Sequence, residues 1–109
     1  MKNVKQFAIL AFAVIPLAFY VAAAPKGDPA QGKETFQQCE VCHNTDTDDA
    51  KVGPSLKGLF ARKKLKSGKP VSDKSVLAQI NNGGGGMPSF AQKLSQEDKD
   101  NLIAYLHTL

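Results

Sequence analysis

The sequence has few of the side chains that build metal or redox sites. It contains no tryptophan, two cysteines, two histidines and two methionines, one of which is the initiator. A closed zinc site built from two CxxC pairs is therefore excluded. The sulfur and imidazole groups beyond the initiator that remain for any such site are Cys39, Cys42, His43, Met87 and His107.

Strand-like alternation, internal repeats and strong bulk charge are also missing. The full chain carries a formal net charge of +4, and removal of an N-terminal leader containing Lys2 and Lys5 would halve it. This small excess does not indicate a nucleic-acid-binding protein.

The N-terminus has the pattern of an export signal. Lys2 and Lys5 precede eighteen uncharged residues, 7–24, which is typical of a signal peptide. An uncleaved membrane anchor is the alternative, because eighteen helical residues span roughly 27 Å, just short of the hydrocarbon core. We predict a signal peptide over 1–24 and one small domain over 25–109, in a periplasmic or otherwise extracytoplasmic compartment.

Helix signals recur along the predicted domain. Asp28 and Pro29 suit the N-cap and first position of a helix that runs into the cysteines. Ser72 is expected to cap a second helix, which ends at Asn81, Asn82 and the glycines after them. Ser95, followed by two acidic residues, is expected to begin a third helix.

The rest of the pattern supports a helical domain with long connections. Residues 44–72 read mostly as a loop, with one short helix expected near 56–62. The last helix has an apolar stripe at three- and four-residue steps. Its members are Leu102, Ile103, Leu106 and Leu109.

The stretch CEVCH allows three kinds of site. A structural zinc site would lack a fourth ligand, and a dithiol pair would be expected near a βαβ pattern that the sequence does not show. A c-type haem site is favoured, because Cys39 and Cys42 are spaced to add to the two porphyrin vinyl groups and His43 can turn its imidazole onto the iron.

Four stretches in the same order extend this interpretation: GKETFQQCEVCH, KVGPSLKGLFARK, GGMPSF and LIAYL. With them the chain resembles the class I c-type cytochromes, in particular small bacterial monohaem members. The resemblance implies an all-α cytochrome c fold, with three to five short helices and long loops wrapped around one covalently bound haem c. It also implies that the first and last helices cross near Gly32, Phe36, Leu102 and Tyr105.

Met87 is the expected sixth ligand of the haem iron. It is the only methionine outside the leader and follows four glycines, 83–86, that let the backbone approach a flat cofactor, while Pro88 stiffens the exit. His107, the other candidate ligand, lies almost at the end of the chain and is expected to point to solvent.

The resemblance implies further roles near the haem. The carbonyl of Pro54 would accept the ring N–H of His43, and Arg62 would reach a haem propionate. The predicted cofactor-binding residues are Cys39, Cys42, His43, Pro54, Arg62 and Met87, with His43 and Met87 as metal ligands. Apolar walls are expected from Leu56, Leu59, Phe60, Val76, Ile80, Phe90 and Leu94.

A His/Met-ligated haem leaves no open position on the iron, so we predict a one-electron carrier rather than an enzyme. The alternative is a haem-based sensor or peroxidase-like protein with a labile sixth ligand. A monomer is expected to shuttle electrons between a membrane reductase and a terminal oxidase or other acceptor of a respiratory chain. An acidic partner could dock on a basic segment containing Lys57, Arg62, Lys63, Lys64, Lys66 and Lys69.

Overall fold

The computed structural model describes residues 11–16 and 26–109. The predicted leader lies largely outside the described residues, and its described part, 11–16, is exposed and has no regular secondary structure. No helix in the described part of the chain is both long and apolar enough to cross a membrane.

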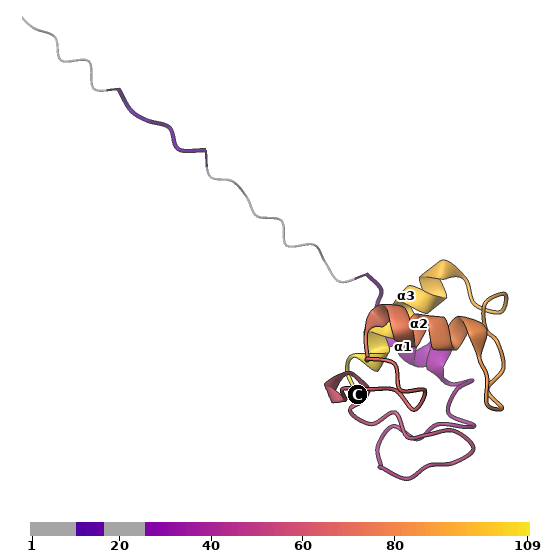
Figure 1. The fold of residues 1–109 in the computed structure, drawn as a ribbon. Coiled ribbons are helices and arrows are strands. Elements are labelled where there is room, and N and C mark those ends of the chain that lie inside the picture. Colours follow the sequence, from indigo (N-terminus) through magenta and orange to yellow (C-terminus); the bar gives the residue numbers. More distant parts are fainter. Residues whose placement is uncertain (1–10, 17–25) are drawn as a thin grey trace, which may run out of the picture.

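Three α-helices and one short 3-10 helix form the domain (Figure 1). Their bounds are α1 Pro29–Phe36, η1 Leu59–Ala61, α2 Asp73–Asn82 and α3 Gln96–Leu106. Between 26 and 109 the β-structure amounts to two isolated bridges, Lys64 with Pro70 and Gly84 with Met87. The all-α prediction is confirmed, and long loops join the helices as expected.

Each of the three α-helices begins at the residue that the sequence predicts. The Asp28 carboxylate accepts from the backbone N–H of Ala30 at the start of α1, over 2.9 Å. Ser72 and Ser95 each form a complete capping box, at α2 and α3 respectively. A capping side chain satisfies backbone donors that the first turn would leave unpaired, so it fixes where each helix begins.

The end of α1 differs from the prediction, because the helix stops at Phe36 and does not reach the cysteines. The N–H of Cys39 donates to the carbonyl of Phe36, three residues earlier, over 2.7 Å. The His43 N–H then donates to the Cys39 carbonyl over 3.0 Å. Successive tight turns therefore follow α1 and lead the chain from Phe36 to His43.

The main helix contact is between α1 and α3. A Cβ added at Gly32 would lie 1.9 Å from the backbone carbonyl oxygen of Asn101, so only glycine permits this approach. The Phe36 and Tyr105 rings lie beside the crossing, with centroids 5.2 Å apart. The predicted crossing is therefore confirmed. The Asn101 side chain also accepts a hydrogen bond from the backbone N–H of Asp28 over 2.7 Å.

We predict that Gly32→Ala destabilises the holoprotein by about 3 kcal/mol or more, because backbone cannot yield as a flexible side chain does. Thermal unfolding followed by circular dichroism should show a midpoint lowered by at least about 12 °C. Gln31→Ala, on the exposed face of the same helix, is the matched control and should leave the midpoint nearly unchanged. Equal midpoints for the two variants would contradict the close crossing.

Candidate functional site

A cavity of about 520 Å³ lies among the helices and the loops that join them. Its walls come from the CxxCH segment, η1, α2, α3 and the glycine-rich loop after α2. All six predicted cofactor residues line it, namely Cys39, Cys42, His43, Pro54, Arg62 and Met87. A volume of this size is within the range of small-molecule and cofactor sites.

The imidazole of His43 is held in one orientation. Its Nδ1 lies 2.7 Å from the carbonyl oxygen of Pro54. Because a carbonyl can only accept, Nδ1 carries the proton and Nε2 keeps a free lone pair. Gly53 packs against the ring, since a Cβ there would lie 2.5 Å from Cε1 of His43. His43 can therefore donate a lone pair from Nε2 while its tautomer is fixed by Pro54.

The two cysteine side chains are half-buried at the same cavity. Burial raises the pKa of the Cys39 thiol to about 11, and the nearby Cys42 and Glu40 add to the shift. A dithiol redox pair needs a lowered thiol pKa, so this environment does not suit that alternative. The zinc alternative fares no better, because residues 11–16 and 26–109 contain no cluster of three His, Cys, Asp or Glu side chains suited to a metal ion.

Met87 approaches the cavity from a loop that only glycines could form. All four residues of 83–86 have positive φ, between 62° and 116°, a region that other residues rarely adopt. A Cβ at Gly83 would collide with the carbonyl oxygen of Met87, whereas the next three glycines have open space on that side. The loop thus turns sharply and presents bare backbone along the cavity wall.

The structure adds Gln79, which the sequence analysis missed. Its side-chain amide N–H donates to the carbonyl of Gly83 over 3.1 Å and lies 3.7 Å from the Met87 sulfur. Gln79 follows Val76 by three residues, and both line the cavity. Helical spacing from Val76 could have identified it.

Of the apolar residues predicted to line the cavity, five do and two do not. Leu56, Leu59, Val76, Ile80 and Phe90 line it as expected. Phe60 and Leu94 do not: Leu94 is buried in the core, and Phe60 packs against the core and stacks on His107. His107 also lies outside the cavity lining and is exposed, although it is not free, because it pairs with Asp73. Lys66, predicted as part of the basic docking segment, also contributes to the rim.

Residues 27–106 match the protein family described as "Cytochrome C oxidase, cbb3-type, subunit III". The chain belongs to this family of cytochrome c domains. Cytochrome c6 from the diatom Phaeodactylum tricornutum has a similar solved structure, with a TM-score of 0.58 and 28% identity, covering 75% of this chain and 93% of that one. The class I cytochrome c fold is thereby confirmed.

Two relatives extend the similarity. Cytochrome c2 from Blastochloris viridis is 46% identical over 49% of this chain and 42% of its own length. Cytochrome c6 from Synechocystis sp. is 32% identical over 72% of this chain and 63% of its own length. This chain therefore spans less than two thirds of the length of either relative.

Membership of a cytochrome c family implies one covalently bound haem c, and the cavity fits it. The cavity is mainly apolar, its glycine loop carries no side chains, and both thiols of the CxxC pair border it. His43 offers an imidazole with a free Nε2 lone pair, and Met87 offers a soft thioether. These donor types are those expected for a haem iron.

We predict that Gly53→Ala displaces the His43 ring and weakens its bond to Pro54. The added methyl would overlap the ring edge, so we expect a loss of about 1–3 kcal/mol and a midpoint lower by about 5–15 °C. Proton NMR of the reduced holoprotein should also show faster solvent exchange of the His43 Nδ1 proton. Ala50→Ser, in the same loop and exposed, is the control. Unchanged exchange in Gly53→Ala would contradict the packing.

Proposed function

We propose that the chain is a monohaem electron carrier in which His43 and Met87 hold the iron. The observation that supports this is that both side chains line the cavity that also contains the two thiols of the CxxCH segment. One imidazole, one thioether and two tethering cysteines are a complete set for a six-coordinate covalent haem.

The chain's own residues would have the following roles in binding the haem. Cys39 and Cys42 tether the haem through thioether bonds. His43 donates its Nε2 lone pair while the Pro54 carbonyl holds its Nδ1 proton. Arg62 lies on the rim, where its guanidinium donates to the Lys57 carbonyl over 2.6 Å, and its other N–H groups would bind a propionate.

This ligand set favours electron transfer over catalysis. A bound haem supplies a one-electron redox couple. Protein ligands on both sides leave no open coordination position for a substrate, and a soft thioether favours the reduced iron, which raises the potential. We therefore propose a carrier and not an enzyme. Its domain, 25–109, would act as a monomer outside the cytoplasm after export by the leader 1–24.

The basic segment is the proposed docking surface for an acidic redox partner, such as a membrane reductase or a terminal oxidase. All six of its cationic side chains, at 57, 62, 63, 64, 66 and 69, are exposed. Two backbone bonds shape the segment, from Val71 N–H to the Lys63 carbonyl and from Leu65 N–H to the Lys69 carbonyl. Arg62 and Lys66 also reach the cavity rim, so a partner bound here would lie close to the haem.

Met87→Leu tests the ligand assignment. We expect the oxidised variant to keep its covalent haem, seen in a pyridine haemochrome spectrum and intact mass, and to lose the near-infrared sulfur-to-iron charge-transfer band. The reduction potential should fall by on the order of 0.1 V, a fraction of the roughly 0.8 V range that axial ligands control. Gln92→Ala, an exposed change five residues away, should retain both properties.

Two results would contradict this assignment. A band that persists in Met87→Leu would mean that another group supplies the sixth ligand. A wild-type protein without the band at neutral pH would favour an open iron site, and hence a sensor or peroxidase-like function.

Reversal of two charges tests the docking surface. Because one-sign patches raise association rates, Lys63→Glu with Lys64→Glu should slow electron transfer to ferricyanide, an anionic oxidant, about tenfold at low ionic strength. The difference should largely disappear above about 0.1 M salt, where the screening length is about 10 Å. The rates would be measured by stopped-flow spectroscopy.

Lys26→Glu with Lys33→Glu is the control, because both lysines are exposed and the net charge changes by the same amount. Equal slowing in the two double variants would show that net charge alone acts, and would remove the basic segment as a docking surface.

A further inference from the structure

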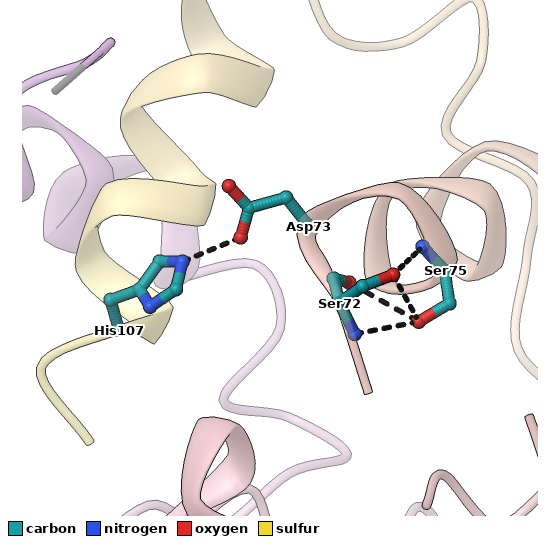
Figure 2. Close-up of polar contacts among 4 residues, drawn as sticks. All are labelled: Ser72, Asp73, Ser75 and His107. Atoms are coloured by element: carbon teal, nitrogen blue, oxygen red, sulfur yellow. Dashed lines mark hydrogen bonds and ion pairs between the residues drawn. The ribbon is translucent and has the colours of Figure 1, made fainter. Parts of the chain in front are cut away.

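His107 joins three parts of the chain from outside the cavity. Its ring Nε2 donates to the carboxylate of Asp73, the first residue of α2, over 2.5 Å (Figure 2). The same ring stacks on Phe60 in η1, with centroids 3.6 Å apart and an angle of 16° between the planes. One side chain directly after α3 therefore contacts both α2 and η1.

Each of these three parts supplies a wall of the cavity. Leu59 comes from η1, Val76, Gln79 and Ile80 come from α2, and Leu102 and Leu106 come from α3. The backbones of α2 and α3 approach each other over only a small region, in contrast with the extensive contact between α1 and α3. A side-chain contact across the weaker junction therefore has more influence there than it would at the main crossing.

The ends of the two helices suit this pairing. The Asp73 carboxylate lies at the N-terminus of α2, and the capping box of Ser72 and Ser75 keeps that turn in place (Figure 2). His107 is the C-cap of α3, where a ring N–H is favoured by the helix dipole. The side chains of His107 and Asp73 are 46% and 67% exposed, so solvent weakens their hydrogen bond and the ring stacking contributes a comparable share.

Helix α2 connects the His107 contact at its first residue to the Met87 side of the cavity. Asp73 and Gln79 are six residues apart on one helix, about 9 Å along its axis. Gln79 bonds the Gly83 carbonyl and lies beside the Met87 sulfur. A displacement of the first turn of α2 would therefore move the amide that contacts Met87 and the loop that carries it.

We propose that His107 is a positioning residue for the Met87 side of the cavity. It lies outside the cavity lining, and it acts by holding α2 and η1 against α3. This inference rests on the proposed function, in which Met87 is an iron ligand, and it adds a residue that the ligand set does not include.

His107→Ala in the oxidised holoprotein is the test. We expect the near-infrared sulfur-to-iron band to disappear at a temperature about 5 °C lower than in the wild type, while the helical circular dichroism midpoint falls by a smaller amount. At a fixed ambient potential near the midpoint, the ratio of reduced to oxidised protein should fall about twofold, because water reaches the iron ligands more easily. A residue with a merely structural role would shift the two thermal midpoints together and leave this ratio unchanged.

Further variants separate the contacts of His107. His107→Phe keeps the stacking on Phe60 and should recover part of the shift. Asp73→Ala should reproduce part of the loss and add little to His107→Ala, because the two changes remove one shared bond. Thr108→Ala is the matched control, since the Thr108 hydroxyl donates to the Tyr105 carbonyl, three residues earlier, and contacts neither α2 nor η1.

The outcomes distinguish this inference from the proposed function. A wild-type protein without the sulfur-to-iron band would remove the proposed ligation, and this inference with it. A wild-type protein with the band, together with a His107→Ala variant that behaves like Thr108→Ala or shifts both midpoints equally, would overturn the positioning role alone.

Discussion

The hydrophobic core of the domain is built around a cavity, and the rest of the structure depends on this constraint. Six of the seven buried apolar side chains line the cavity. They are Phe36, Leu59, Val76, Ile80, Leu102 and Leu106. Left to water, a cavity of about 520 Å³ would deprive the apolar side chains that face it of packing partners on that side. A covalent group that fills the volume is thus part of the core, and tethering through two cysteines keeps it there.

The crossing of α1 and α3 fixes the part of the cavity that contains the CxxCH segment. The close approach at Gly32 and the bond from Asp28 to Asn101 set the position of α1. Tight turns then lead from Phe36 to His43 with hydrogen bonds at nearly every step. A fixed α1 therefore determines where the imidazole lies, and the carbonyl of Pro54 determines how it is rotated.

Much of this arrangement could be predicted from the sequence, because the signals are local. The helix caps and the CxxCH spacing involve residues within a few positions of one another, and the helix starts at Asp28, Ser72 and Ser95 are as predicted. The crossing was predicted from the resemblance to the class I cytochromes, and the absence of a side chain at Gly32 permits it. The wrong predictions for the cavity wall depended on which way a side chain turns. Phe60 was expected in the cavity wall, but its ring stacks on His107, forty-seven residues later, and is absent from the cavity lining. No pattern within a short window encodes that choice.

The two sides of the cavity are held with different strength, which bears on how the proposed carrier would behave. The His43 side follows directly from a helix packed tightly against α3. On the other side, Met87 follows a loop of four glycines after α2. The contact between α2 and α3 is small. Glycine loses the most conformational entropy when it is ordered, so this loop needs external support. Gln79 provides such support by bonding the Gly83 carbonyl and approaching the Met87 sulfur. In the proposed ligation the thioether bond would therefore be the first to yield under stress, and the contacts that steady α2 would set how readily the protein changes from a carrier to a haem with an open iron position.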